Sequence, residues 1–229
     1  MSQLEVIEVP SEKEAIGTVI WLHGLGASGN DFSPIAPHMQ LPDVRFIFPH
    51  APTRPITLNG GWESRAWYDV RTLEITPRRE STAHIIESTE LLARLIIQEN
   101  KRGIPTEQIM ICGFSQGGAM ALHLGHRYPQ KLLGAVVMSG YLVLEDTFAL
   151  EAAEANEFTP MLFCHGERDL VVSIARGFHA YEKIKTCHAN VEWKDYPVGH
   201  EVCLEELRHI RLWMHHRFAK LRQQLAENT

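Results

Sequence analysis

Residues 113–117 read Gly-Phe-Ser-Gln-Gly and directly follow a short run of apolar residues. That run, 108–112, is rich in isoleucine and predicts a buried strand, whereas residues 119–124 favour a helix. A serine on such a sharp strand-to-helix turn has a strained backbone and an exposed hydroxyl. The flanking glycines are required because larger side chains would collide with the strand or the helix. The pattern predicts Ser115 as a nucleophile; the alternative is a tight corner without chemistry.

A nucleophilic serine needs a histidine base, and in chains with this turn the order is serine, then an acid, then the histidine. His200 lies in the loop 197–201, between a predicted strand at 191–196 and the last predicted helix. Because loops at strand ends collect catalytic side chains in such sheets, we predict His200 as the base. The competing histidines, most of them in predicted helices, are His123, His126, His165, His179, His188, His209, His215 and His216.

The acid is expected in the loop after the strand that precedes the strand of His200. The compact apolar run 160–164 predicts that strand, and Asp169 follows it in a turn. Asp169 would hold the imidazole in one tautomer and stabilise the imidazolium without taking the proton itself. The alternatives are Glu167, two residues away, and then Asp146 and Asp195.

The tetrahedral intermediate of acyl transfer needs two N–H donors for its oxyanion. The residue after the nucleophile, Gln116, supplies one donor, and a loop after an early strand supplies the other. Residues 18–22 predict that strand, and His23-Gly24-Leu25-Gly26 follows it, with glycines that let the backbone approach a substrate closely. We therefore predict the Leu25 N–H as the second donor. Taken alone, this motif also fits a flexible turn.

The four cysteines lack the Cys-x-x-Cys spacing that is typical of metal and redox sites. Cys112 and Cys164 end predicted strands and are expected to be buried thiols in a reducing compartment. Cys203 lies three residues beyond His200 and is a rival nucleophile, although the glycine-flanked serine is better placed. Because neither His-Glu-x-x-His nor a clustered Cys/His spacing occurs, no metal site is predicted.

The strands and helices that must position these residues alternate along the chain. Such alternation predicts an α/β fold with a mostly parallel central sheet and helices on both faces. The N-terminal strand is expected to form an antiparallel edge, because it pairs naturally with the next run across a short turn. The predicted strands are 4–9, 18–23, 44–48, 108–113, 132–138, 160–165 and 191–196, and the predicted helices are 31–39, 80–101, 116–127, 173–187 and 202–226.

Residues 49–79 do not fit this alternation, since they hold four prolines, a Gly-Gly pair and three aromatic residues. A long structured loop in a compact domain is usually functional. We expect this loop to cover the active site, with a small hairpin over 56–61 that turns at Asn-Gly. Leu58, Trp67 and Val172 are predicted to line an acyl groove. The alternative is a surface loop that its aromatic side chains hold in place without touching a ligand.

Several different short motifs are distributed along most of the chain, from about residue 18 to about residue 206. They are His23-Gly24-Leu25-Gly26, Phe48-Pro49-His50-Ala51-Pro52, Asn59-Gly60-Gly61, Trp67-Tyr68-Asp69, Gly113-Phe114-Ser115-Gln116-Gly117-Gly118-Ala119-Met120, Ser139-Gly140, His165-Gly166 with Asp169, and Gly199-His200-Glu201. With these motifs the chain resembles the carboxylesterase and acyl-protein thioesterase branch of the α/β-hydrolases, the phospholipase/carboxylesterase group. The Phe-Ser-Gln-Gly-Gly turn joined to the Trp-Tyr-Asp segment is specific to this branch.

The resemblance implies an α/β-hydrolase fold, with Ser115, Asp169 and His200 as the catalytic triad and Leu25 and Gln116 as the oxyanion hole. It implies hydrolysis of carboxylic esters, thioesters or lysophospholipids without a cofactor, and it suggests a homodimer. The sequence departs from the family in two places. The stretch Leu170-Val171-Val172-Ser173 replaces one in which prolines are frequent, and Val198 stands where methionine is frequent. Both departures concern the shape of the acyl pocket more than the chemistry.

Composition limits the classes of protein that remain. The chain has 229 residues, 45% of them hydrophobic, which suits one domain over residues 1–229 with one core. A formal net charge of −6 and the lack of a Lys/Arg block argue against nucleic acid as a partner. The N-terminus has no basic region or long apolar run, and no segment reaches the length of a membrane span. We expect a cytoplasmic protein without stable membrane insertion.

The predicted function is that of a serine carboxylic-ester hydrolase, acting on short- to medium-chain acyl esters through an acyl-enzyme intermediate. The lack of a basic membrane-binding helix favours small soluble esters as substrates. The alternatives within enzymes are an acyl-protein thioesterase and a lysophospholipase. An alternative of another class is a non-catalytic binding protein with the hydrolase fold. Such a protein is expected to lack a triad member, whereas this chain has a candidate for each.

Overall fold

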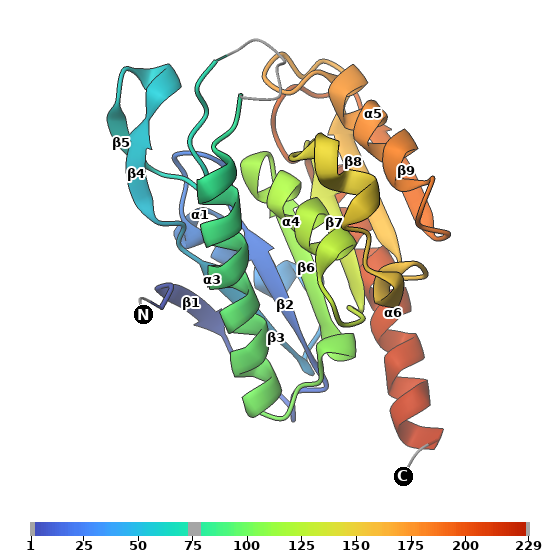
Figure 1. The fold of residues 1–229 in the computed structure, drawn as a ribbon. Helices are drawn as coiled ribbons and strands as arrows, with labels where there is room; N and C mark the ends of the chain where they lie inside the picture. Colours follow the sequence, from blue (N-terminus) through green and yellow to red (C-terminus); the bar gives the residue numbers. More distant parts are fainter. Residues whose placement is uncertain (1–2, 73–78, 228–229) are drawn as a thin grey trace.

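A seven-stranded sheet organises the part of the chain that the computed structural model describes, residues 3–72 and 79–227 (Figure 1). The strand order is β1-β3-β2-β6-β7-β8-β9, and all neighbours are parallel except β1 and β3. This is the mostly parallel α/β sheet that the sequence predicted. Its strands are β1 (Val6–Val9), β2 (Gly17–Leu22), β3 (Val44–Pro49), β6 (Ile109–Phe114), β7 (Gly134–Met138), β8 (Met161–Gly166) and β9 (Val191–Tyr196).

Helices cover both faces of the sheet, and this explains the continuous apolar runs of its central strands. In Figure 1, α3, α4 and α5 lie in front of the sheet and α6 lies behind it. Ile20 of β2 belongs to the core with α3 and α4, whereas its neighbour Trp21 packs on the side of α2 and α6. The helices are α1 (Gly29–Phe32), α2 (Ala36–Met39), α3 (Thr82–Lys101), α4 (Gln116–Arg127), α5 (Ile174–Ile184) and α6 (Leu204–Glu227).

The stretch predicted as one helix over 31–39 is helical, but it is divided into two four-residue α-helices and a 3₁₀ turn. A 3₁₀ turn (Ser33–Ile35) separates α1 from α2. Pro34 and Pro37 cannot donate a backbone hydrogen bond, so a regular helix cannot run through them. The predicted helix over 173–187 is closer to the structure, although α5 ends at Ile184.

The first strand is an antiparallel edge, as predicted, but it pairs with a different neighbour. It lies against β3, with Val6 opposite Pro49 and Val9 opposite Phe46, and not against β2. Both edges of β2 are already occupied by parallel partners, β3 and β6. The only strand edge left to the N-terminal segment on this side of the described sheet is therefore that of β3.

The unusual segment after β3 forms a hairpin that is longer than predicted. Strands β4 (Thr53–Ile56) and β5 (Trp62–Arg65) pair in antiparallel fashion around a 3₁₀ turn (Thr57–Asn59). Gly60 and Gly61 follow with positive φ angles of 69° and 84°, which glycine adopts at little cost. The hairpin stands beside the carboxyl ends of the parallel strands, at the top of Figure 1. Residues 73–78 of the predicted covering loop lie outside the described residues.

None of the helices in the described residues combines the length and the apolar character that a membrane crossing requires.

Candidate active site

Ser115 occupies the turn between β6 and α4 in the strained conformation that its flanking glycines predicted. Its φ of 55° and ψ of −116° lie outside the regions that side-chain-bearing residues favour, at a cost of about 1–3 kcal/mol. A Cβ atom at Gly113 would overlap the carbonyl of Gly117, and one at Gly117 would overlap the carbonyl of Leu22. The two glycines therefore let the strand-to-helix turn over residues 113–117, called the elbow below, pack closely against β2. Ser115 lies in this elbow, immediately before the N-terminus of α4.

The structure brings together the three residues predicted as nucleophile, base and acid. His200 Nε2 lies 2.8 Å from Ser115 Oγ, although the two residues are 85 positions apart in the sequence. His200 Nδ1 lies 2.7 Å from Asp169 Oδ2. A carboxylate only accepts hydrogen bonds, so Nδ1 carries the proton and Nε2 offers its lone pair to the serine hydroxyl. This tautomer can remove a proton from Ser115 when the hydroxyl attacks a carbonyl.

The carboxylate of Asp169 is buried and held by backbone donors. Its Oδ1 accepts the N–H groups of Val171 and Val172 at 2.9 and 2.8 Å, which leaves Oδ2 for His200. The two backbone N–H groups thus fix the carboxylate, and the carboxylate in turn orients the imidazole of His200. The competing carboxylate, that of Glu167, is exposed to solvent.

His165 supports the acid loop, a contribution that the sequence did not reveal. Its Nε2–H donates to the carbonyl of Val172 at 2.8 Å and lies 3.6 Å from Asp169 Oδ2. Burial lowers the pKa of His165, so the ring is neutral at pH 7 and adds no second cation beside the carboxylate. Gly177 of α5 lies where any Cβ would overlap this ring. The signal in the sequence was the position of His165 at the carboxyl end of a buried strand.

The loop that carries Leu25 lies directly against the nucleophile. A Cβ built on Gly24 would stand 3.4 Å from the Cβ of Ser115. His23 anchors the loop, because its Nδ1–H donates to the Gly24 carbonyl at 2.7 Å and its Nε2 accepts the Ala51 N–H at 3.0 Å. Burial lowers the pKa of His23 to about 4, so this pairing holds one neutral tautomer. Leu25 therefore follows a backbone segment whose position is defined beside Ser115.

Gln116 and Trp67 join the two halves of the predicted oxyanion hole. The Gln116 side chain accepts the Trp67 N–H and donates to the Tyr68 carbonyl, both at 2.7 Å. The Trp67 indole N–H donates to the carbonyl of His23 at 2.9 Å. The backbone N–H of Gln116 belongs to the first residue of α4, where helix geometry offers no internal acceptor. Trp67 thus ties the elbow to the loop that carries Leu25.

The structure separates the three side chains predicted to line an acyl groove. Leu58 lies on the hairpin turn and is 37% exposed, so its side chain is accessible to an acyl chain. Trp67 has no exposed surface, and Val172 is only 3% exposed, because both belong to the core between the sheet and α3 and α4. The predicted groove-lining role of Trp67 and Val172 is therefore corrected. Their contribution is structural, through the contacts to His23, Gln116 and Asp169 described above.

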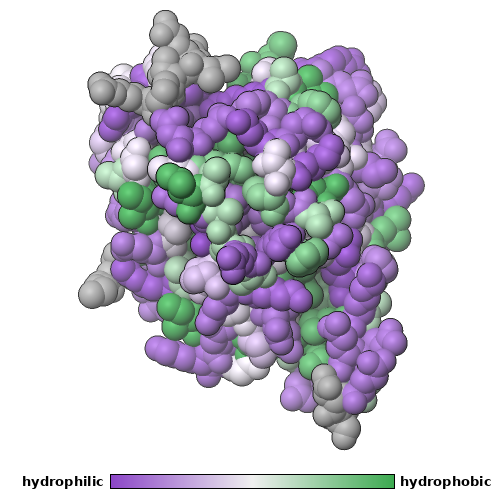
Figure 2. All heavy atoms as spheres, turned by 45° about the vertical axis from the view of Figure 1, so that its right-hand side comes forward, coloured by the Kyte–Doolittle hydropathy of each residue, from purple (hydrophilic) through white to green (hydrophobic). Residues whose placement is uncertain are grey.

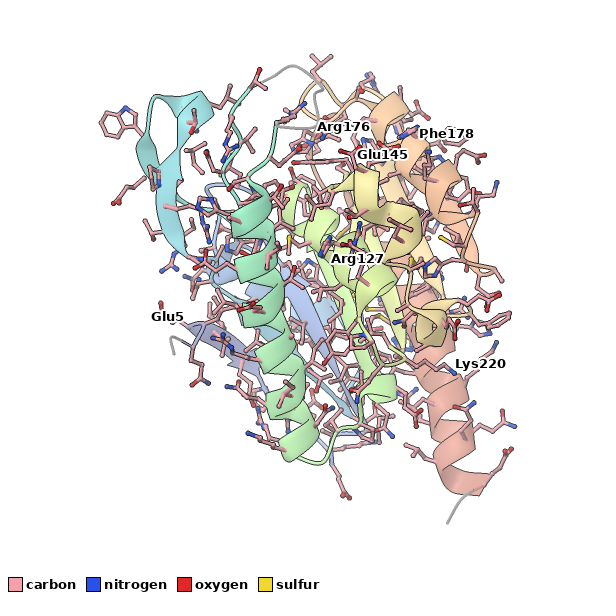
Figure 3. All side chains as sticks on the ribbon, viewed as in Figure 1. Glu5, Arg127, Glu145, Arg176, Phe178 and Lys220 are labelled. Carbon is pink, nitrogen blue, oxygen red and sulfur yellow. The ribbon has the colours of Figure 1, made fainter. Side chains whose placement is uncertain are left out.

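A cavity of about 960 Å³ lies between α3, α4 and the start of α5. Its walls combine apolar side chains such as Leu142 and Leu144 with charged ones, of which Figure 3 labels Arg127, Glu145 and Arg176. The molecular face in Figure 2 has the same mixed character, with small hydrophobic patches among hydrophilic side chains. None of the predicted triad or oxyanion residues lines this cavity, so it is separate from the reacting atoms.

The rival thiol is not the partner of the predicted base. Cys203 Sγ accepts the backbone N–H of Glu206 at 3.4 Å, whereas both ring nitrogens of His200 are engaged by Asp169 and Ser115. The geometry therefore favours the serine over the cysteine as nucleophile.

Comparison with known proteins places this geometry among relatives. Residues 2–216 match the phospholipase/carboxylesterase family. The acyl-protein thioesterase 1 of Neurospora crassa is 38% identical over 224 residues, which cover 93% of this chain and 91% of that protein. The carboxylesterase SOBER1 of Arabidopsis thaliana is 34% identical over 206 residues, covering 87% of this chain and 90% of that protein.

Solved structures agree with the sequence relatives. The crystal structure of Arabidopsis thaliana SOBER1 superposes with a TM-score of 0.82 at 32% identity, covering 88% of this chain and 99% of that chain. The crystal structure of Zea mays acyl-protein thioesterase 2 also has a TM-score of 0.82, at 30% identity, covering 93% of this chain and 98% of that chain.

Proposed function

Because the chain belongs to the phospholipase/carboxylesterase family of the α/β-hydrolases, we propose that Ser115, His200 and Asp169 are its catalytic triad. Relatives along almost the whole chain are named acyl-protein thioesterase and carboxylesterase, and the protein is a serine hydrolase of carboxylic esters. The observation that carries the triad assignment is the pair of hydrogen bonds of His200, 2.8 Å to Ser115 Oγ and 2.7 Å to Asp169 Oδ2.

The geometry leads to a two-step reaction through an acyl-enzyme. Ser115 Oγ attacks the acyl carbonyl carbon while His200 Nε2 takes the hydroxyl proton. The bond from the acyl carbon to the leaving oxygen or sulfur then breaks, and His200 returns the proton to the leaving group. Water repeats the sequence and releases the free acid, and Ser115 recovers its proton. Asp169 stabilises the imidazolium in both steps without taking a proton.

The developing oxyanion is assigned to the backbone N–H groups of Leu25 and Gln116. Two observations support this assignment: Gly24 packs against Ser115, and hydrogen bonds to Trp67 and Tyr68 hold the side chain of Gln116 in place. At the start of α4 the helix dipole adds favourable potential for negative charge. Donors that are already in place cost no reorganisation when the charge forms.

The test of the triad is active-site labelling of the full chain with a fluorophosphonate, followed by peptide mapping. We expect the label on Ser115, no label on Ser115→Ala, and strongly slowed labelling of His200→Ala. Cys203→Ala serves as the control for the rival nucleophile and should label like the unmodified chain. Labelling that persists in Ser115→Ala, or that disappears in Cys203→Ala, would overturn the assignment.

For the substrate we propose acyl esters of short to medium chain length. The loop that carries Asp169 exposes the apolar side chains of Leu170 (97%) and Val171 (65%), and Leu58 is exposed on the hairpin. A fully buried methylene contributes about 0.8 kcal/mol, but an acyl chain on such open side chains buries only part of its surface. Each added methylene should therefore raise kcat/KM by clearly less than about fourfold.

A p-nitrophenyl ester series from acetate to palmitate tests this proposal directly. The expected profile is a shallow rise and an early plateau, and Leu58→Ala and Leu170→Ala should flatten it. Leu150→Ala is the matched control, since this leucine is 88% exposed on a segment that carries no predicted site residue. A steep rise to palmitate would contradict the short-chain proposal while leaving the triad intact.

Thioester hydrolysis is the second candidate, because a relative at 38% identity is named for it. Acyl thioesters and oxygen esters of equal chain length separate the two activities. A kcat/KM for the thioester that exceeds that of the matched ester would favour the thioesterase function.

A further inference from the structure

Three side chains with metal-binding atoms meet near the C-terminal end of α4, away from the triad. His126 Nδ1 and His188 Nε2 are 3.1 Å apart, and Cys187 Sγ is 3.9 Å from His126 Nδ1. All three ligand atoms lie within 4.8 Å of one another. Among the residues that the structure describes, they form the one group of at least three His, Cys, Asp or Glu side chains with this property.

These separations fit one tetrahedral ion. Zn–N bonds of about 2.0–2.1 Å and a Zn–S bond of about 2.3 Å, at tetrahedral angles, place two nitrogens about 3.4 Å apart and nitrogen and sulfur about 3.6 Å apart. The observed 3.1 Å and 3.9 Å, both measured from His126 Nδ1, differ from these values by a few tenths of an ångström. The third pair, Cys187 Sγ and His188 Nε2, lies within 4.8 Å, so an ion draws these two atoms together by at most about 1.2 Å.

The hydrogen bonds of His126 leave the correct nitrogen available. Its Nε2 lies 2.7 Å from the backbone carbonyl of Phe148, which only accepts, so Nε2 carries the proton and the lone pair of Nδ1 faces His188. A metal-binding histidine typically donates its other N–H in this way, which holds the ring in place. The ring also stacks on Phe148, with centroids 3.9 Å apart and planes 8° apart. His126 is therefore oriented before any ligand arrives.

The two imidazoles have the protonation state that metal binding needs, whereas burial raises the pKa of the Cys187 thiol, which keeps its proton at pH 7 until an ion binds. Burial lowers the pKa of His126, and burial together with His126 lowers the pKa of His188 to about 4. Both rings are therefore neutral at pH 7, as a metal ligand must be. In the metal-free chain the 3.1 Å contact requires His188 Nε2 to donate to His126 Nδ1. Binding moves that proton to His188 Nδ1 and releases the thiol proton of Cys187 to solvent, which leaves two imidazole lone pairs and one thiolate.

We propose that His126, Cys187 and His188 form a binding site for a zinc-class divalent cation. Two imidazoles and one thiolate are the donor set that Zn²⁺ favours, and hard ions such as Mg²⁺ and Ca²⁺ prefer oxygen ligands. Three protein ligands leave one coordination position for water. A depression of about 420 Å³ lined by Cys187 and His188 gives the ion a path from solvent, and Cys187 itself is only half-buried.

The site lies far from the chemistry of Ser115. His126 is 11 residues further along α4, so the rise of the helix places it about 16 Å away. The ion joins the end of α4 to the segment between α5 and β9, which carries Cys187 and His188. We therefore infer that the metal stabilises the packing of these segments and takes no part in ester hydrolysis.

Cobalt(II) is the probe, because a thiolate ligand gives it a charge-transfer band and tetrahedral geometry gives it intense visible bands. The full chain is freed of metal with a chelator under reducing conditions and titrated with Co²⁺, and Zn²⁺ then competes for the site. The test variants are Cys187→Ala and His188→Asn. The matched controls are Cys203→Ala, at another half-buried cysteine, and His216→Asn, at an exposed histidine of α6.

We expect one Co²⁺ per chain, a charge-transfer band that Zn²⁺ abolishes, and a higher melting temperature with either ion. Cys187→Ala should lose the band, and His188→Asn should bind at least about 10–100-fold more weakly, since even second-shell changes cost that much. Both controls should behave like the unmodified chain. Absence of binding, or a band that survives Cys187→Ala or is lost in Cys203→Ala, would overturn the proposal. Esterase activity should be the same with and without Zn²⁺, so this outcome is independent of the proposed triad.

Discussion

An imidazole lies at each end of α4, and the two imidazoles have different electrostatic surroundings. At the N-terminal end, His200 contacts a serine hydroxyl and a buried carboxylate, and its side chain is 17% exposed. At the C-terminal end, His126 contacts a second histidine, a thiol and a backbone carbonyl, and it has no exposed surface. Each imidazole is oriented through one ring nitrogen, which leaves the other free to react or to bind.

The partner of the oriented nitrogen determines what the other nitrogen can do. A carboxylate stabilises an imidazolium, so His200 can accept the proton of Ser115 and hold it during turnover. A neutral carbonyl in a buried setting gives an imidazolium little support, so His126 remains neutral and its lone pair is available to a metal ion. Under the two proposed roles, residue type alone does not distinguish a general base from a metal ligand.

The largest expected effect is the loss of activity when the proposed nucleophile, Ser115, is replaced. Ser115→Ala should lower kcat for p-nitrophenyl acetate by about 10⁶-fold, because the acyl-enzyme can no longer form. The measurement is steady-state hydrolysis by matched amounts of folded protein, with Cys203→Ala as the control that retains activity. A loss of less than about 10²-fold would place the nucleophile elsewhere.

The next effect tests the carboxylate that distinguishes the two histidines. Asp169→Asn should lower kcat by about 10⁴-fold, because the amide can donate to Nδ1 and so favours the wrong tautomer of His200. Glu167→Gln, at an exposed carboxylate on the same loop, is the matched control and should change kcat little. If the two variants behaved alike, the orienting role of Asp169 would be refuted.

A smaller effect concerns the side chain that joins the elbow to the loop of Leu25. Gln116→Ala keeps the backbone N–H but removes the hydrogen bonds to Trp67 and Tyr68. We expect kcat to fall by less than about 10²-fold, since loss of a whole oxyanion donor costs about 10²–10³-fold. The fall should appear in kcat with KM nearly unchanged. A change confined to KM would mean that this side chain contacts the substrate instead.

The smallest expected effect is a pH dependence of the free energy of unfolding, caused by the buried, neutral His188 in the cluster with His126 and Cys187. Burial first, and His126 second, lower the pKa of folded His188 to about 4, against about 6.5 in the unfolded chain. Because the folded pKa is depressed, the contribution of His188 is complete above pH 6.5 and is lost as the pH falls toward 4. Between pH 7 and pH 5 the metal-free protein should lose about 2 kcal/mol of its free energy of unfolding through this residue.

Urea unfolding at the two pH values measures that loss. His188→Asn should reduce the pH dependence by about 2 kcal/mol, whereas His216→Asn should leave it as it is in the unmodified chain. Other buried histidines contribute in the same direction, since burial also lowers the pKa of His23 to about 4 and that of His123 to about 3. Equal pH dependence in the two variants would contradict a neutral, buried His188.

Much of the fold and of the candidate triad was predictable because the relevant signals are local. Apolar runs located the strands of the main sheet to within about two residues at most of their ends. The glycines at 113 and 117 predicted the elbow, since only glycine fits beside the backbone of α4 and β2 there. The strained φ of Ser115 follows from the same five residues. The errors lie where local signals compete, as at the two prolines that break the helix predicted over 31–39.

The contacts that lay beyond prediction join segments that are distant in the sequence. Burial of Trp67 depends on how the hairpin returns to α4, so an aromatic residue expected on a groove became part of the core. His165 supports Asp169 only because α5, at Gly177, packs against its ring. His126 and Cys187 are 61 positions apart, so no spacing rule could pair them.

By itself, the amino-acid sequence determined the elements, their order and the conformation of the nucleophile, because steric fit within a turn and the periodicity of apolar residues involve only near neighbours. Only the tertiary structure decided which carboxylate meets His200, which aromatic rings are buried, and that two histidines and a cysteine converge at the far end of α4. These contacts depend on how the helices pack on the sheet. Packing brings together side chains that are far apart in the sequence, so their sequence separation does not predict their distance in space.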